Sequence, residues 1–251
     1  MSGPGTEPLA DTTAAPLRAA AGFFSFTEVE AGAHRSYNEW HLFDHLPEQY
    51  ALPGIVGGQR WVLTPALAAA AGATASAPLD RVHYVTMYLL ADPLDVTLTD
   101  FFHHGIALAK ADRFHQQRTS HLAGALRVES ARAAPAALVQ PGVVPFRPGT
   151  GVHVRLEDAA AGPGPSDLAD AVLGVAGVAG VWTFAGAVPD DGPTAGLRLT
   201  CAWLDGDPST VDAALTAALP PPAPDPGGAS GPTFAGTLAA IDPHAPFGWF
   251  D

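Results

Sequence analysis

The sequence predicts an α+β fold of two tandem ferredoxin-like βαββαβ repeats that pack sheet to sheet within one chain. Each half shows strand and helix patterns in the order strand, helix, strand, strand, helix, strand. Three segments of the first half also recur in the second half in the same order. The matching pairs are Leu52–Trp61 with Ala176–Phe184, Tyr88–Pro93 with Trp203–Pro208, and Leu122–Leu126 with Phe234–Leu238.

The elements of the first half follow from apolar alternation for strands and a 3.6-residue period for helices. We expect strands at Phe23–Val29, Val56–Thr64, Arg81–Leu90 and Leu122–Ser130, and helices at Ser36–Leu52 and Leu94–Arg118. Pro47 is expected to interrupt the first helix at Leu46, because proline lacks the N–H that continues a helix.

The second half gives the same order of elements. The expected strands are Gly151–Glu157, Gly180–Ala187, Leu197–Leu204 and Thr233–Ile241, and the expected helices are Ser166–Ala176 and Ser209–Leu219. Ser166 and Ser209 are suitable N-caps. Stretches rich in proline and glycine divide the chain into a disordered tail (1–21), an N-terminal domain that carries the site (22–130), a linker (131–150) and a degenerate C-terminal repeat (151–251). The stretch Pro220–Pro232 is expected to be a long loop.

Composition excludes several classes of function. The formal net charge is -13, with only 12 Lys and Arg in 251 residues, which argues against nucleic acid or an anionic membrane as a partner. Cys201 is the single cysteine, so no disulfide framework is expected. Because the sequence has no apolar stretch of membrane-spanning length, we expect a cytoplasmic protein. We expect its partner to be an apolar or aromatic small molecule. The chain is expected to be a monomer with an internal pseudo-dimer, or a homodimer.

Chemically capable side chains concentrate in the segment Tyr37–Gly54. His41 and His45 are four residues apart, so on a helix they share one face. Imidazole titrates near neutral pH and suits general acid–base chemistry. We therefore expect His45, His41 and Asp44 to be catalytic residues, with His45 as the leading general base and His41 as its acid or orienting partner.

Further candidates lie outside this segment. His104 follows Phe101 on the second predicted helix and is a second candidate acid. Tyr84 and Tyr88 share one face of a strand and could bind an enolate or phenolate oxygen. Arg60 would be costly to bury unless it met a carboxylate or an anionic ligand. The expected substrate-binding residues are Tyr37, Trp40, Tyr50, Arg60, Tyr84, Tyr88 and Phe101.

The first half also resembles a known family. Trp40, Asp44–Pro47, Leu52–Gly54 and Arg60–Trp61 resemble the W…D-x-H-x-P…P-G…R-[YW] pattern of EthD-like proteins of the dimeric α+β barrel superfamily. Asp44 and His45 are adjacent here, whereas the usual pattern separates them by one residue. The resemblance implies an intramolecular α+β barrel with a cavity between sheet and helices that holds a flat apolar substrate or haem.

Several functions share this scaffold, so the fold does not choose among them. The superfamily that the chain resembles includes cofactor-free monooxygenases, polyketide cyclases, muconolactone isomerases and haem enzymes. We expect a cofactor-independent enzyme of secondary metabolism that cyclises, isomerises or oxygenates a polyketide-like or phenolic substrate. The alternatives are a haem-dependent oxidoreductase and a non-catalytic binding or accessory protein. A zinc site would need a third ligand that the His41/His45 spacing does not supply, so no metal is expected.

Overall fold

The chain folds into a closed antiparallel β-barrel with helices on its outside. The computed structural model describes residues 17–70, 74–220 and 233–250. Within these residues, eight strands follow the order β2-β4-β1-β5-β7-β8-β6-β9, and pairing of β2 with β9 closes the ring. A short ninth strand, β3 (Thr74–Ala75), pairs with β9. The predicted α+β class and barrel are confirmed.

The first half contributes one side of the barrel. Its elements are β1 (Ala21–Val29), α1 (His34–Trp40), the π-helix η1 (His41–His45), α2 (Leu46–Gln49), β2 (Ile55–Val62), α3 (Pro65–Ala69), η2 (Leu79–Arg81), β4 (Tyr84–Leu90), α4 (Leu94–Lys110) and β5 (Arg118–Ala133). Its strands lie in the order β2-β4-β1-β5, so the first strand in sequence is flanked by the third and the fourth long strands of this half.

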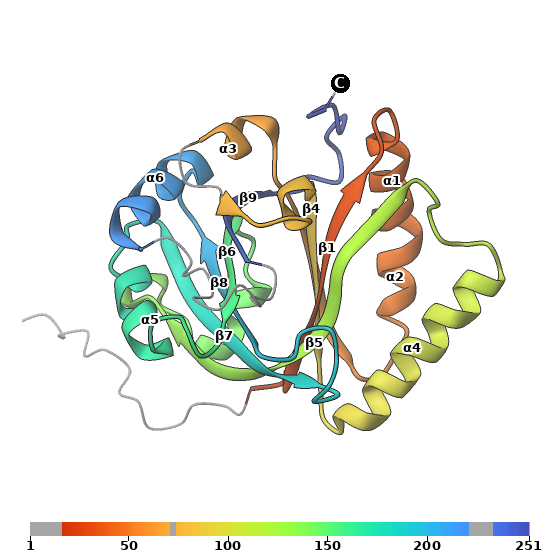
Figure 1. Cartoon of the computed structure of the whole chain (residues 1–251), viewed down its shortest axis with the longest axis horizontal. Helices are drawn as coiled ribbons and strands as arrows, with labels where there is room; N and C mark the ends of the chain where they lie inside the picture. Colours follow the sequence, from red (N-terminus) through yellow and green to blue (C-terminus); the bar gives the residue numbers. More distant parts are fainter. Residues whose placement is uncertain (1–16, 71–73, 221–232, 251) are drawn as a thin grey trace, which may run out of the picture.

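The second half repeats this arrangement. Its elements are η3 (Pro135–Ala137), η4 (Pro141–Phe146), β6 (Gly151–Asp158), α5 (Pro165–Leu173), β7 (Val178–Val188), β8 (Leu197–Leu204), α6 (Pro208–Ala218) and β9 (Phe234–Ala240). Their order is β7-β8-β6-β9, so the first strand is again flanked by the third and the fourth. Figure 1 shows α1, α2 and α4 on one side of the barrel and α5 and α6 on the other. No helix in the described ranges is both long and apolar enough to span a membrane.

The first predicted helix was right in position but wrong in its interruption. The chain does not break at Leu46; a π-helical turn precedes α2, and the Leu46 N–H bonds to the His41 carbonyl five residues back. Pro47 then lies in the first turn of α2, where its missing N–H costs little. Because proline cannot donate to the preceding turn, the backbone widens just before it, and this widened turn carries both histidines.

Other boundaries also differ from the predictions. Helix α4 ends at Lys110, and Asp112 has a positive φ of 55°, so residues 111–117 form a turn and Arg118 begins β5 instead of ending a helix. The predicted N-caps Ser166 and Ser209 were wrong. The N-cap positions are held by Gly164 and Asp207, and the Asp207 carboxylate accepts a hydrogen bond from the Thr210 N–H. A proline follows each cap, and its fixed φ suits the first helical position.

The end of the predicted tail and the start of the predicted linker belong to strands of the barrel. Of the tail, residues 1–16 lie outside the described part, and Ala21 already belongs to β1. The predicted linker starts inside β5, which continues to Ala133 and pairs with β7. Most of the predicted loop Pro220–Pro232 lies outside the described residues.

The barrel interior is packed with apolar side chains from both halves. Aromatic rings from both halves meet there, as in the edge-to-face contact of Phe24 with Phe184, whose centroids are 4.9 Å apart. Trp61, Trp182 and Trp203 belong to the same interior cluster. On β4, Met87 points into the barrel. Tyr84, Thr86 and Tyr88 are on the opposite face, as predicted from strand alternation.

Candidate functional site

A cavity of about 450 Å³ lies between the outer face of the barrel and the helices of the first half. Strands β1, β4 and β5 form its floor, and α1, η1, α2 and α4 with the turn after it form its walls. Its lining residues are Phe23, Ser25, Thr27, Tyr37, Trp40, His41, His45, Gln49, Thr86, Tyr88, Phe101, Phe102, Gly105, Ile106, Ala109, Phe114, Arg118, Ser120 and Ala123. Among the described residues, the lining is rich in aromatic rings and contains no Asp or Glu.

The π-helix brings His41 and His45 side by side on the cavity wall. Their ring centroids are 5.2 Å apart, in an edge-on arrangement. His45 stacks on Trp40, with centroids 4.7 Å apart and an angle of 22° between the rings. In the described part of the chain, the Nδ1 atoms of both histidines are buried and have no hydrogen-bond partner. Each ring therefore keeps a nitrogen free for other chemistry.

His41 is paired with Tyr88 across the floor of the cavity. Its Nε2 lies 3.4 Å from the Tyr88 hydroxyl, a long hydrogen bond. Burial and the nearby charge of Arg60 hold the pKa of His41 well below its usual value, while burial raises the pKa of Tyr88. At neutral pH the pair therefore consists of a neutral imidazole and a protonated phenol. Gly58 leaves room for this phenol, because a Cβ there would lie 3.0 Å from the Tyr88 ring.

His45 is also neutral at pH 7. Burial lowers its pKa from 6.5 to about 4, and the charge of Arg118 acts in the same direction, whereas Asp44 opposes the shift. A neutral imidazole can accept a proton, which is the state that a general base requires. The cations that lower this pKa would also favour an anion formed in the cavity.

We expect the free energy of unfolding to fall as pH is lowered from 6.5 toward 4. His45 and the buried His153 of β6 both have a pKa of about 4 in the folded protein against 6.5 as the ordinary value. The unfolded chain therefore binds more protons in this window, and stability is lost as pH falls. Each histidine can contribute up to about 3 kcal/mol. Urea unfolding at pH 7, 6, 5 and 4.5 measures the slope.

The His153→Asn variant provides the control for this slope. The His153 Nδ1 bonds to the Thr237 hydroxyl at 2.9 Å and has Asp212 and Arg155 as its charged neighbours. Asparagine keeps a polar atom near Thr237 but does not titrate, so the slope should become shallower. An unchanged slope in this variant would show that His153 is not the source.

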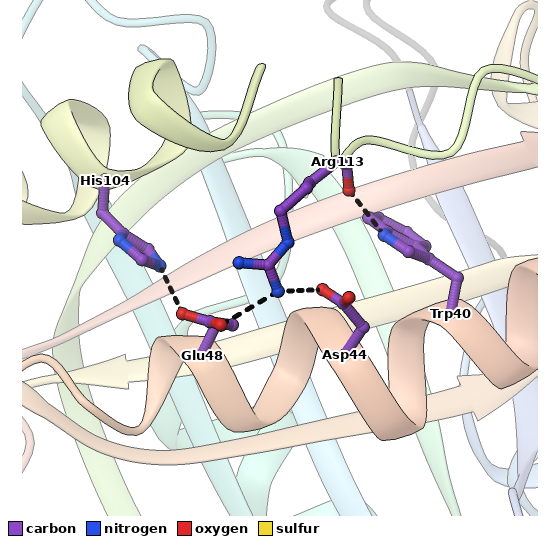
Figure 2. Close-up of polar contacts among 5 residues, drawn as sticks. All are labelled: Trp40, Asp44, Glu48, His104 and Arg113. Atoms are coloured by element: carbon purple, nitrogen blue, oxygen red, sulfur yellow. Dashed lines mark hydrogen bonds and ion pairs between the residues drawn. The ribbon is translucent and has the colours of Figure 1, made fainter. Parts of the chain in front are cut away.

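An ion-pair cluster beside the cavity connects α4 and the turn after it to the helices on the opposite wall. Arg113, in the turn after α4, reaches Asp44 at 2.8 Å and Glu48 at 2.9 Å. The Trp40 indole N–H donates to the Arg113 carbonyl at 2.7 Å, and His104 Nε2 lies 3.8 Å from Glu48, as Figure 2 shows. We call these five residues the clamp. Asp44 and His104 belong to it and do not line the cavity, so the catalytic roles predicted for them are withdrawn.

Three of the predicted binding residues also lie outside the cavity lining. Tyr50 is half exposed and donates its hydroxyl hydrogen to the Gly58 carbonyl at 2.9 Å. Tyr84 is buried under α1, with His34 Nδ1 and Asn38 Nδ2 each 3.0 Å from its hydroxyl. Arg60 is 5% exposed, and its guanidinium lies over the rings of Tyr37 and Tyr84, 4.9 and 5.2 Å from their centroids. Tyr37, Trp40, Tyr88 and Phe101 line the cavity.

The structure adds cavity residues that the sequence reading missed. Arg118 and Phe114 were placed on a helix, but they belong to β5 and to the turn before it. The Arg118 guanidinium lies over the rings of Trp40 and Phe114, 5.6 and 5.2 Å from their centroids. Gln49 reaches the cavity from α2 with its Oε1 buried and without a partner in the described residues. The alternation of Ser25 and Thr27 with inward-facing phenylalanines on β1 could have indicated the floor.

The cavity residues do not fit a haem well. A histidine that ligates a metal usually donates its second ring N–H to a carboxylate or a carbonyl. Within the described ranges neither His41 nor His45 has such a partner, and Arg118 is the only Lys or Arg on the lining for two propionates. The same ranges contain no group of three or more His, Cys, Asp or Glu placed to hold a metal ion.

Comparisons with known proteins give only distant likenesses. No protein-family model and no curated protein matches the sequence. A solved structure described as a proposed chlorite dismutase has a TM-score of 0.49 at 10% identity, with 93% of this chain and 100% of that chain covered. A proposed monooxygenase from Fusobacterium nucleatum has a TM-score of 0.44 at 9% identity, with 89% and 94% covered. The encapsulated DyP-type peroxidase from Mycobacterium smegmatis has a TM-score of 0.48 at 12% identity, with 91% and 94% covered. At these scores neither activity nor ligand carries over to this chain.

Proposed function

We propose that the chain is an enzyme that moves a proton on a flat phenolic or enolic small molecule, without a bound organic cofactor. One observation carries the proposal: two neutral imidazoles, each with a free buried nitrogen, lie on the wall of an aromatic cavity. Surface or packing histidines would not need to share a wall with a buried phenol. Their presence on a π-helical turn agrees with the tendency of such turns to occur at functional sites.

His45 is the proposed base. The O–H bond of the substrate breaks, its proton forms an N–H bond on His45, and the electron pair stays on oxygen and delocalises to a ring or chain carbon. Return of the proton from His45 to that carbon gives the keto tautomer, so atoms and charge balance. Trp40 holds the His45 ring by stacking, and the aromatic walls orient a flat substrate.

Tyr88 is proposed to stabilise the anion. Its pKa is raised, so it stays protonated and can donate a hydrogen bond to the oxyanion. His41 can donate from Nε2 to the Tyr88 oxygen and so direct the phenolic hydrogen toward the substrate. The same deprotonation begins a cyclisation, an isomerisation, or an oxygenation in which O₂ is the oxidant.

Measurement of hydrogen exchange tests the proposed proton transfer without knowledge of the natural substrate. 1,3-Dihydroxynaphthalene and phloroglucinol are flat, and their ring C–H groups exchange through keto tautomers. In deuterated buffer under argon, the protein should accelerate loss of the ring proton signals in NMR spectra, because His45 returns a deuteron to carbon. Rates equal to those with the heat-unfolded protein, for both compounds, would contradict the proposal. Oxygen uptake on admission of air would identify the oxygenase branch.

Two other functions make different predictions for the purified protein. A haem enzyme on this scaffold would show a strong absorption band near ~400 nm from its bound haem, which we do not expect because the histidines lack the usual partners. A non-catalytic binding protein would bind the two aromatic compounds and leave their exchange rates unchanged. The exchange assay therefore separates binding from catalysis.

We also propose that the barrel arose by duplication of a ferredoxin-like unit, of which the first copy is EthD-like. The identical strand order of the two halves supports this history. In the second copy, α5 and α6 pack directly on the sheet over an apolar cluster that includes Leu168, Val211 and Leu215. The copies would thus have separate tasks, one holding the site and the other closing the barrel.

A further inference from the structure

The cavity has an unbalanced positive charge. In the part of the chain that the structure describes, its lining contains Arg118 and no carboxylate, although the whole chain has 25 Asp and Glu against 12 Lys and Arg. The nearest acidic groups on η1 and α2, Asp44 and Glu48, are both bonded to Arg113 in the clamp. Arg118 is therefore not neutralised by the carboxylates that lie closest along the wall.

Arg118 also has unused hydrogen-bonding capacity. Its one hydrogen bond in the described residues runs from Nη1 to the Ser120 hydroxyl at 3.2 Å, and its Nε is buried without a partner. The rings of Trp40 and Phe114 hold the guanidinium in place through cation–π contacts. A guanidinium fixed in this way is prepared to bind a planar anionic group through two hydrogen bonds.

A second cation lies behind the wall. Arg60 is 5% exposed, and Nε and both Nη atoms are buried without a hydrogen-bond partner in the described ranges. Its guanidinium lies 4.9 Å from the ring centroid of Tyr37, which lines the cavity. Arg60 cannot touch a ligand, but in a medium of low dielectric constant its charge extends through the ring of Tyr37.

We propose that the cavity binds its aromatic ligand as an anion, a carboxylate or phenolate held by Arg118, with Arg60 as a second, non-contacting charge. This inference rests on the proposed function only in placing the ligand in the same cavity. It restricts the substrate class to flat aromatic acids and to phenols that ionise on binding. The negative group lies at the corner formed by Arg118, Trp40 and Phe114, next to His45.

Calorimetric titration with matched probes tests the inference. 1-Naphthoate and 1-naphthamide have the same ring and nearly the same shape, but only the first is charged. The wild-type protein should bind 1-naphthoate about 10- to 100-fold more tightly, the range expected for hydrogen bonds to a charged group. 1-Naphthol distinguishes the source of the anion, since an absorbance shift to the naphtholate spectrum at pH 7 marks a phenolate site and its absence marks a carboxylate site.

Two variants locate the effect. Arg118→Gln should lose most of the preference for 1-naphthoate and keep only the small part due to Arg60, whereas Arg118→Lys, which keeps the charge, should retain a larger part. Arg81→Gln is the matched control, because Arg81 is exposed and its ion pair is with Glu28, at 3.3 Å. It should keep the full preference.

Equal affinities in the wild type, or an undiminished preference in Arg118→Gln, would overturn the anion site and leave the exchange assay unaffected. If neither 1-naphthoate nor 1-naphthamide bound to the wild-type protein, both this inference and the proposed function would be overturned. Should Arg118→Gln fail to fold, a reduced preference in Arg118→Lys supports a role for the planar guanidinium, and an undiminished preference contradicts it.

Discussion

Replacement of His45 by phenylalanine should slow protein-catalysed exchange of 1,3-dihydroxynaphthalene by about 10²–10⁴-fold, the usual contribution of a general base. Phenylalanine keeps a flat ring that can stack on Trp40 as His45 does. It removes both nitrogens and therefore the proton acceptor. The NMR exchange rate at saturating substrate measures the effect, and affinity for the substrate should change little because the wall stays aromatic.

The control for this variant is His103→Phe. His103 is exposed on α4 and does not line the cavity. The same substitution there adds a ring and removes an imidazole without reaching the substrate, so the exchange rate should stay near the wild-type value. A fall of less than threefold in His45→Phe would exclude His45 as the base. In that case the same test on His41→Phe decides whether the second imidazole has the role.

The acid limb of the pH–rate profile gives independent evidence on the same residue. A general base must be deprotonated, and the pKa of His45 is about 4 in the folded protein. Catalysis should therefore persist below pH 6, where an ordinary histidine would already be protonated. The charges of Arg118 and Arg60, which lower this pKa, also lower the pKa of a bound phenol, so the proton transfer remains feasible although the base is weak.

The fold was predictable because it depends on periodicity. Strand alternation correctly put Tyr84 and Tyr88 on one face of β4, and the structure places that face outside the barrel, opposite Met87. Strand β8 was predicted with the bounds that it has, Leu197–Leu204. These patterns survive in a single sequence because each apolar residue must face a packed layer.

The site was only partly predictable because its shape depends on contacts distant in sequence. The spacing of His41 and His45 indicated a shared face, and the cavity wall contains both. Asp44 and His104 also have side chains that can transfer protons, but they pair with Arg113 and Glu48, respectively, in the clamp. No local pattern shows which carboxylate a distant arginine will bind.

Arg118 is a cavity residue that the sequence did not indicate. Its segment looked helical because α4 precedes it without a proline or glycine break, and the positive φ at Asp112 that ends the helical course has no clear mark in the sequence. Because the end of this helix was predicted too late, the sequence did not indicate that Arg118 lines the cavity. Among the described residues, Arg118 is the one Arg or Lys on the lining. The cost of burying Arg60 was foreseen from its residue type, although its neighbours were not.

Replacement of Arg60 by methionine should raise the free energy of unfolding by about 1–3 kcal/mol, because it removes an uncompensated charge from the interior. The guanidinium makes no hydrogen bond in the described residues, and its contacts with Tyr37 and Tyr84 recover only part of the desolvation cost. Methionine has a similar length and packs well against aromatic rings. Urea unfolding at pH 7 without ligand measures the gain.

The same substitution should weaken binding of 1-naphthoate while that of 1-naphthamide stays unchanged. A residue that costs stability and aids the binding of a charged ligand is serving the site, since proteins commonly give up stability where function requires it. Arg60→Lys is the control: it keeps a buried charge and should show neither the gain in stability nor the loss of selectivity for the anion. If Arg60→Met is instead less stable than the wild type by more than about 1 kcal/mol, the guanidinium has a structural role. Its contacts with the rings of Tyr37 and Tyr84 would then explain its burial, and its charge would not be assigned to ligand binding.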